Sequence, residues 1–443
     1  MNGLIMTAQL LLGLSILVIL HELGHFLAAR AFGIKVEKFY LFFDAWNVKL
    51  FSIKKGDCEY GIGWLPLGGY VKIAGMIDES MDTEQLAQPV QPWEFRSKPA
   101  WQRLIVMLAG VVVNVIVGIL IFWMLTFKYG ETYIPNNSAQ NGINPGTVGE
   151  SIGLQKGDKV LAINGKKVIR FEEISSSKVL LENTTLTVLR GNKTLYVKVP
   201  DNLLNTISDD GIESFVSRVP LLSSTIDSIV PGKPAEKAGI HRGDVITGIN
   251  NTPVKYNVEV ADAIQKAKGK PMVFNIKRGD EQVLLTLPAD TSGSVGIGFR
   301  VSEIKQETTK YGLFEALPIG ANQAWKTFSD NAKGIAKVFT GKIKANKAFS
   351  GPVDIARKIY GGEWVWARFW ASTAFISVAL AFMNLLPIPA LDGGHVVFLL
   401  IEMVKGKPLG DKFMERAQMV GFVILLSLMV FVLGNDIFKN FIK

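Results

Sequence analysis

Cysteine and histidine are both scarce in this chain. Its 443 residues include one cysteine, Cys58, and four histidines. A single thiol cannot form a disulfide within the chain, and it cannot build a zinc site from several thiolates. A metal site in this protein would therefore depend on histidine and carboxylate ligands.

Charge is also missing from long stretches of the sequence. Residues 1–20 contain no Asp, Glu, Lys or Arg, and 48% of the chain is hydrophobic. The start lacks a basic n-region, so we expect no cleavable signal peptide. The net charge of +9 could indicate nucleic-acid binding in a soluble protein. In so apolar a chain it is better explained by membrane topology, and we expect no nucleic-acid partner.

Four stretches are apolar enough to cross a bilayer, which takes roughly 20 residues of helix. They are residues 4–32, 104–127, 369–391 and 419–435. The third contains Pro387 and Pro389. The sequence thus predicts a multi-pass α-helical membrane protein with four transmembrane helices.

Basic residues predict how these helices are oriented. Lys and Arg gather after the first span, before the second, and between the third and fourth, whereas none precedes the first. The positive-inside rule places those loops in the cytoplasm. Both termini and the long segment between the second and third spans would then lie outside.

The cytoplasmic residues 34–77, within the first part of the membrane core (1–127), are predicted to form strands. Gly-rich and alternating runs favour hairpins, with a bend at Pro66 and at Gly68-Gly69. An apolar, non-helical segment beside a membrane must be covered by protein or line a cavity. Its edge could pair with an extended substrate strand, or the hairpin could be purely structural, and the sequence leaves both open.

The outer segment contains a repeat with an offset of 86 residues. The repeat is carried by Pro145-Gly146, Gly157-Asp158 and Ile163-Asn164, which return as Pro231-Gly232, Gly243-Asp244 and Ile249-Asn250. Two copies of this length indicate tandem domains, over 128–214 and 215–305. Each copy resembles a bacterial PDZ domain of the kind attached to proteases. Such domains bind peptides or chain ends by strand addition, and here they could equally be bulk that excludes large substrates.

Residues 306–368 follow the repeats and precede the second part of the membrane core, residues 369–443. From Tyr311 to Ala348, aromatic residues interleave with lysines at helical spacing. This pattern is typical of an amphipathic helix on the outer membrane surface, in contact with the lipid bilayer. It also fits a solvated helix packed on the repeats.

The motif that carries chemistry ends the first span, at His21-Glu22-Leu23-Gly24-His25. Residues four apart share one face of a helix, so His21 and His25 can offer two imidazoles to one metal ion. Two neutral imidazoles suit zinc, and Glu22 can take a proton from metal-bound water. The alternative is a solvated helix end, but ionisable side chains inside a spanning helix usually have a function.

Catalytic zinc commonly has three protein ligands and a position left for water. The candidate for the third ligand is Asp392, which follows Pro387 and Pro389 at the cytoplasmic end of the third span. Asp392 could instead cap a helix that begins at Gly393. His395 could be a fourth ligand, which would close the site and make it structural.

HELGH in the first span and NxxPxPxLDGG over residues 384–394 together resemble the site-2 protease family of intramembrane zinc metalloproteases. The tandem PDZ-like insert is similar to that of RseP-type bacterial members. The resemblance implies a zinc enzyme of the bacterial inner membrane, with periplasmic PDZ domains and an active site near the cytoplasm. It also implies single-span membrane protein substrates, such as an anti-sigma factor or remnant signal peptides, cut after a first, outer cleavage.

Substrate-binding residues are implied by the same resemblance. The Gly-rich strands would receive the substrate backbone through Gly61, Gly63, Gly68 and Gly69. Asn384 matches the family's substrate-contacting asparagine. The second span lacks the proline of the family's Gly-Pro-x-x-Asn pattern but keeps Gly110 and Asn114. Asn114 is either a polar clamp at the site or a contact between helices, and both asparagines could steady the developing oxyanion or the unwound peptide.

These features predict a membrane zinc protease in which His21, His25 and Asp392 bind zinc and Glu22 is the general base. A second hypothesis is a membrane-anchored scaffold whose PDZ pair binds outer peptides and whose metal is structural. A metal transporter is a weaker third hypothesis, because the spans offer few polar residues for a path.

Overall fold

The computed structural model describes residues 2–76, 88–267, 269–288, 294–348 and 351–438. The chain divides into two compact units. The first unit joins residues 1–130 to residues 310–443, and the second consists of residues 131–309.

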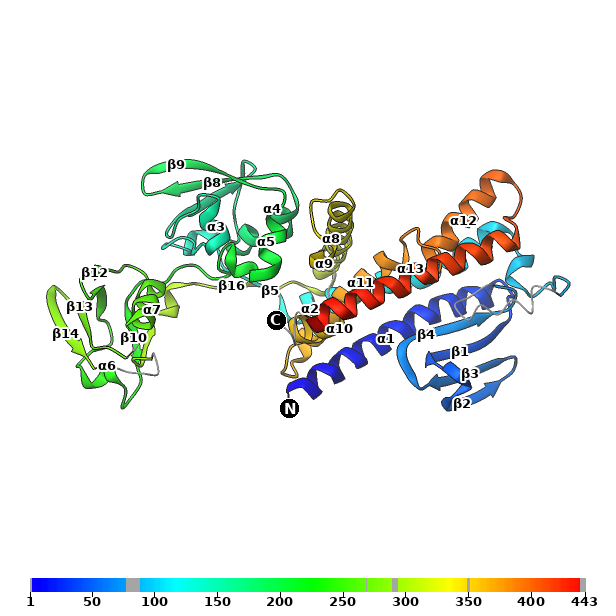
Figure 1. Cartoon of the computed structure of the whole chain (residues 1–443), viewed down its shortest axis with the longest axis horizontal. Coiled ribbons are helices and arrows are strands. Elements are labelled where there is room, and N and C mark those ends of the chain that lie inside the picture. Colours follow the sequence, from blue (N-terminus) through cyan, green and yellow to red (C-terminus); the bar gives the residue numbers. More distant parts are fainter. Residues whose placement is uncertain (1, 77–87, 268, 289–293, 349–350, 439–443) are drawn as a thin grey trace. The chain divides into compact units, whose positions relative to one another are not determined.

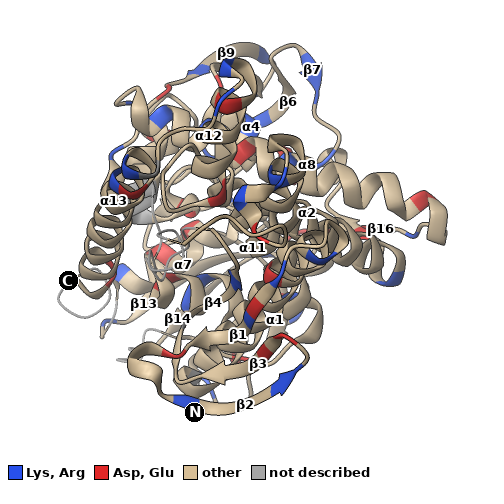
Figure 2. Ribbon diagram, turned by 90° about the vertical axis from the view of Figure 1, so that its right-hand side faces the viewer, with Lys and Arg blue, Asp and Glu red and all other residues tan. Residues whose placement is uncertain are grey.

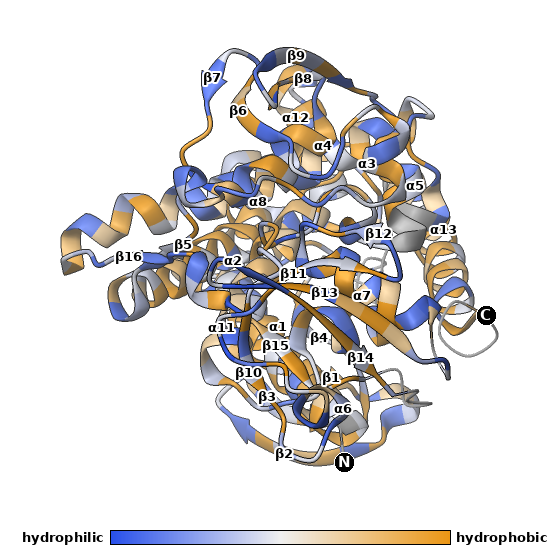
Figure 3. Cartoon of the chain, turned by 90° about the vertical axis from the view of Figure 1, so that its left-hand side faces the viewer, coloured by the Kyte–Doolittle hydropathy of each residue, from blue (hydrophilic) through white to orange (hydrophobic). Residues whose placement is uncertain are grey.

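Among the described residues of the first unit, four helices are long and apolar enough to cross a membrane, which agrees with the predicted number. They are α1 (Asn2–Ala31), α2 (Ala100–Tyr129), α11 (Trp366–Asn384) and α13 (Asp411–Ile437). In Figure 3, α13 is largely orange, the colour of hydrophobic residues. A helix satisfies its own backbone hydrogen bonds, so an uncharged helical run can lie in lipid.

The predicted end of the third span is wrong. Helix α11 stops at Asn384, because Pro387 and Pro389 lack the N–H groups that would continue the helical ladder. The chain then passes through turns and enters a separate helix, α12 (Asp392–Lys405). Asp392 is thus the first residue of a new helix.

Helix α2 is central to the first unit, since it packs against α1, α11, α12 and α8 (Leu313–Phe339). Glycines allow these close contacts. A Cβ on Gly24 would lie 2.6 Å from the carbonyl oxygen of Ala109, and one on Gly118 would lie 2.5 Å from a methyl group of Val378. Small residues at helix contacts commonly let spanning helices approach closely.

Helix α8 corresponds to the amphipathic helix predicted after Tyr311. It packs along α2 and α11 through buried small residues, Ala316, Gly320 and Ala324, spaced by four. The indole N–H of Trp123 donates to the carbonyl oxygen of Leu313 at 2.6 Å. The exposed aromatic side chains of α8 are Phe314, Trp325 and Phe339.

A four-stranded sheet follows α1 in the chain and lies beside it in Figure 1. Its strands are β1 (Val36–Phe43), β2 (Lys49–Lys55), β3 (Cys58–Gly63) and β4 (Leu65–Ile73), in the order β2-β3-β1-β4. One face packs on α1, where the rings of Phe39 and Tyr60 contact Phe26. At Pro66 and Gly68-Gly69, where a bend was predicted, β4 stays one edge strand but its pairing with β1 is irregular, because Leu65 pairs with Phe43 whereas Gly69 pairs with Leu41.

The second unit contains two sheets with the same strand order, β7-β6-β8-β9 and β12-β11-β13-β14, as expected of a repeat. The first has β6 (Lys159–Ile163), β7 (Lys166–Lys167), β8 (Thr184–Arg190) and β9 (Lys193–Val199). The second has β11 (Val245–Ile249), β12 (Thr252–Pro253), β13 (Met272–Arg278) and β14 (Glu281–Leu287).

The repeated aspartate makes the same contact in both copies. Arg190 donates two hydrogen bonds of 2.7 Å to the buried carboxylate of Asp158. Arg278 does the same to Asp244 at 2.8 Å. Burial alone would raise the pKa of Asp244, but Arg278 and the backbone N–H of His241 hold it below its usual value. A buried carboxylate needs such a partner, which explains why aspartate and arginine recur together.

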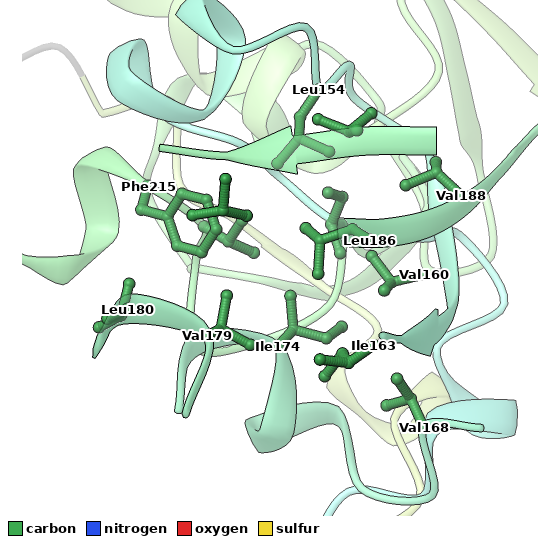
Figure 4. Close-up of a cluster of buried hydrophobic side chains, with 14 of the residues drawn as sticks. Leu154, Val160, Ile163, Val168, Ile174, Val179, Leu180, Leu186, Val188 and Phe215 are labelled. Atoms are coloured by element: carbon green, nitrogen blue, oxygen red, sulfur yellow. The ribbon is translucent and has the colours of Figure 1, made fainter. Parts of the chain in front are cut away.

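The two copies differ where the chain leaves the sheet. The first copy has an apolar core that includes Leu154, Val160, Ile163, Val168, Ile174, Val179, Leu180, Leu186, Val188 and Phe215 (Figure 4). Helix α5 (Leu203–Asp210) adds Leu203 and Ile207 to this core and packs against α4 (Ser177–Leu181). In the second copy, the strand β15 (Ile297–Phe299) pairs with β10 (Ile226–Ile229), where the first copy has an isolated bridge between Pro145 and Val216.

Candidate metal centre

Helix α1 presents His21 and His25 on one face, with ring centroids 4.8 Å apart. Asp392, the first residue of α12, reaches them from a distant part of the chain. Its Oδ2 lies 3.2 Å from Nε2 of His21 and 3.4 Å from Nε2 of His25. The structure thus brings together the three residues predicted to bind the metal, with one ligand atom of each within 4.8 Å of the others.

The Asp392 carboxylate tests whether a metal ion fits this cluster. Its Oδ2 is buried and makes no hydrogen bond of acceptable geometry with any described residue. A buried, ionised oxygen without a donor is costly. A divalent cation between this oxygen and the two imidazole nitrogens would satisfy all three groups, and two imidazoles with one carboxylate suit catalytic zinc. The residues present therefore fit zinc.

The far nitrogen of His25 is held by the backbone of α2. Nδ1 lies 2.8 Å from the carbonyl oxygen of Val106. A carbonyl oxygen can only accept, so Nδ1 carries a proton, and in the neutral imidazole Nε2 then has the lone pair that a metal ion needs. Contacts of this kind fix the orientation of metal-binding histidines.

Asn114 contacts Nδ1 of His21, as the carbonyl group of Val106 contacts Nδ1 of His25. Its side-chain amide lies 3.2 Å from Nδ1 of His21, and its Oδ1 is buried without a donor among the described residues. Exchanging the amide oxygen and nitrogen would let Nδ1–H donate to Oδ1 and would leave Nε2 for a metal. The backbone carbonyl of Asn114 also accepts a 2.7 Å hydrogen bond from Ser377 on α11. Asn114 therefore contacts both the site and a neighbouring helix.

Gly110, which belongs to the family pattern of the second span, lies directly against the metal ligands, and the sequence indicated no role of its own for it. A Cβ at this position would lie 2.3 Å from Nε2 of His25 and 2.6 Å from Cε1 of His21. Helix α2 thus passes directly against the two imidazoles, and only glycine leaves them room. In the sequence, the one indication that Gly110 lies at the site is its position four residues before Asn114, on the same helix face.

Asn384 ends α11 next to the same cluster. Its side-chain amide lies 3.1 Å from Nε2 of His21, the nitrogen that faces Asp392. The amide is therefore within reach of any group bound between these ligands.

Glu22 lies between the metal ligands and the sheet. Val71, in β4, lies close enough to act electrostatically on its carboxylate. A Cβ on Gly69 would lie 3.6 Å from Cγ of Glu22, so β4 passes close to the predicted base.

The four predicted glycines fall into two groups. Gly68 and Gly69 belong to β4, where a Cβ on Gly69 would lie 3.6 Å from Cγ of Glu22 and one on Gly68 would meet only the ring of Phe43. Gly61 and Gly63 belong to β3, which β1 separates from β4. A Cβ on either would lie within 2.4 Å of atoms of β1, so packing inside the sheet explains why these two residues are glycine.

His395 is outside the ligand cluster. Its side chain is buried, and its Nε2 lies 2.6 Å from the amide nitrogen of Gln418 on α13. In the part of the chain that the structure describes, the cluster holds three ligands. Three ligands leave a coordination position for water, as in catalytic rather than structural zinc sites.

Comparison with known proteins agrees with this geometry. Residues 9–428 match the profile of peptidase family M50. The chain is 30% identical over 446 residues to the regulator of sigma E protease of Haemophilus influenzae, covering 97% of this chain and 98% of that protein. It is 29% identical over 461 residues to the regulator of sigma-E protease RseP of Escherichia coli, covering 97% of each. A protein of Vibrio cholerae named as a zinc metalloprotease is 29% identical over 450 residues, covering 96% of this chain and 97% of that protein.

Proposed function

The chain belongs to peptidase family M50, the site-2 metalloproteases, and we propose that it hydrolyses a peptide bond within or near the spanning segment of single-span membrane proteins. His21, His25 and Asp392 would bind the zinc ion. The observation that supports this most directly is the meeting of these three residues, from two distant helices, beside Glu22 in an apolar bundle.

Each remaining site residue has a role in the proposed reaction. Zinc bound here supplies a Lewis acid that lowers the pKa of water and polarises a carbonyl group. Glu22 takes a proton from the attacking water as general base and delivers it to the leaving amine. Val106 and Asn114 hold the imidazoles in place. The amide of Asn384 donates to the oxyanion that develops on the substrate.

The substrate would reach this site as an extended segment. A helix hides its peptide bonds in its own hydrogen-bond ladder, so the cleaved segment must unwind locally. Strand β4 lies at an edge of its sheet and passes beside Glu22, so its edge could pair with the unwound segment. Gly68 and Gly69, without side chains, would let the substrate backbone approach.

The biological setting follows from the relatives and from the charge pattern. Because two relatives are named as regulators of sigma E, we extend the proposal to regulated intramembrane proteolysis of an anti-sigma factor, and to remnant signal peptides as a second substrate class. The basic loops favour an active site near the cytoplasmic face of a bacterial inner membrane, with residues 128–305 on the periplasmic side. Residues 306–368 would then meet the outer lipid surface.

Removing the metal should abolish cleavage. The purified full chain in detergent would be given a model single-span peptide, and the products identified by mass spectrometry. A zinc chelator should stop cleavage, and about one zinc ion per chain should restore it. The scaffold hypothesis expects zinc in the protein but no cleavage before or after the chelator.

We also propose that residues 128–214 and 215–305 are two PDZ domains with unequal capacity for ligands. In the first, α5 places Leu203 and Ile207 against α4 and closes that side of the core. In the second, β15 pairs only with β10 within the described residues, so one edge of the strand is available. An extended peptide would therefore add to β15.

Matched isoleucines test this difference between the copies. Ile297→Glu in β15 should weaken binding of a fluorescent peptide with an apolar C-terminus by about tenfold or more, because a charge would enter the peptide contact. Ile212→Glu changes a similarly half-buried isoleucine in the first copy and should leave binding unchanged. Fluorescence anisotropy on the full chain measures both. The reverse order of effects would contradict the assignment.

A further inference from the structure

Helix α13 is held by very few residues. Among those whose side chains the structure describes, only Gln418, Gly421 and Asp436 are buried. Figure 2 shows the helix tan along most of its length, with charged residues near its beginning. Two of the three buried residues are polar, and a polar side chain in a spanning helix is costly without a partner. The contacts of these three residues therefore decide how α13 is attached.

Gln418 is attached to the helix that carries Asp392. Its amide nitrogen lies 2.6 Å from Nε2 of His395, and the two side chains are 5% and 8% exposed. His395 follows Asp392 by three residues, so both lie on one side of the first turn of α12. This contact joins the last span to the turn that presents the carboxylate ligand.

Gly421 packs against Pro389, three residues before Asp392. A Cβ on Gly421 would lie 1.8 Å from the carbonyl oxygen of Pro389, so only glycine permits this approach. Gly421 follows Gln418 by three residues and shares its helix face. The next residue after Pro389, Ala390, has a φ of 75°, a conformation that a non-glycine residue keeps only when its surroundings impose it.

The first residues of α12 pack closely against residues 386–389 as well. A Cβ on Gly394 would lie 2.5 Å from the carbonyl oxygen of Ile388, and one on Gly393 would lie 2.3 Å from that of Leu386. The segment 386–391 is thus clamped between the start of α12 and the Gln418–Gly421 face of α13. The path of residues 386–391 determines where α12 begins, and so determines the position of Asp392.

We propose that Gln418 and Gly421 are positioning residues of the metal centre, which hold the 386–391 segment so that Asp392 meets the two imidazoles. The inference rests on the proposed zinc site. A ligand must be held to within a fraction of an ångström of its productive position, and the groups that hold it affect metal affinity. Helix α13 therefore belongs to the metal centre although it contributes no ligand.

Zinc affinity of the full chain in detergent tests this role. Gln418→Met keeps a side chain of similar size and removes the hydrogen bond, and it should weaken Zn²⁺ binding by about tenfold in competition with a chromophoric chelator. Gly421→Ala should act in the same direction. The visible absorption of Co²⁺ bound in place of zinc should also change in both variants, since it reports the arrangement of the ligands.

Asp436→Ala is the matched control on the same helix. Asp436 accepts hydrogen bonds from the backbone N–H groups of Val353 and Asp354, the former at 2.8 Å, and lies about four helical turns along α13 from Gly421. This variant should keep wild-type zinc affinity. An equal loss in Asp436→Ala would mean that any loosening of α13 weakens the site, and would overturn the specific role of Gln418.

A double variant and the wild type complete the test. Gln418→Met with His395→Leu should bind zinc about as weakly as Gln418→Met alone, because both changes remove one contact. Wild-type zinc affinity and an unchanged Co²⁺ spectrum in Gln418→Met and Gly421→Ala would overturn the inference and leave the zinc site standing. Absence of zinc binding by the wild type would overturn the proposed function itself.

Discussion

Replacing Glu22 by glutamine should leave zinc bound and lower cleavage of a single-span peptide by about 10²- to 10⁴-fold, the usual contribution of a general base. Glutamine retains the shape of the side chain and can keep its position beside Gly69 of β4. It cannot take a proton from the attacking water. Zinc content by atomic spectroscopy and cleavage by mass spectrometry would be measured on the same purified variant.

Asp392→Asn is the informative companion to this variant. Asparagine removes the charge of a residue whose Oδ2 lies within 3.4 Å of both imidazoles, so zinc and activity should be lost together. Cleavage by Glu22→Gln at the normal rate would remove Glu22 from the role of base. Loss of zinc from Glu22→Gln would instead indicate that this carboxylate helps hold the metal.

Gly110→Ala should weaken zinc binding by about 100-fold and reduce cleavage with it. The new Cβ would lie 2.3 Å from Nε2 of His25, one of the nitrogens that would face the metal. Because the obstructing atom sits on the backbone of α2 and cannot turn away, the imidazoles or the helix would have to move. Zinc affinity would be measured by chelator competition, with thermal unfolding recorded to show that the bundle remains folded.

Gly118→Ala provides the matched control on α2. Its Cβ would also be crowded, at 2.5 Å from a methyl group of Val378, but it would meet a side chain of α11 instead of a metal ligand. This variant should lose some stability and keep its affinity for zinc. Equal zinc affinity in Gly110→Ala and the wild type would contradict the close approach of α2 to the imidazoles.

Some features of the site could be predicted from residues that are close in sequence. The four-residue spacing of His21 and His25 brings two imidazoles to one helix face, because an α-helix turns through 3.6 residues. The uncharged runs predicted four spanning helices, since length and composition decide whether a helix suits lipid. The repeated dipeptides predicted two tandem domains, and the third protein ligand that catalytic zinc commonly has indicated Asp392, after the two prolines of the third span.

Other features were decided only by the tertiary structure. The end of the third span, the position of β4 beside Glu22, the hydrogen bond between Asn114 and His21, and the need for glycine at position 110 all depend on elements far apart in the chain. The contact of Gln418 with His395 is of the same kind. Spacing within one helix follows from backbone geometry, which each local stretch carries. Distances between helices depend on where they cross and how closely they pack, and no single segment of the sequence contains that information.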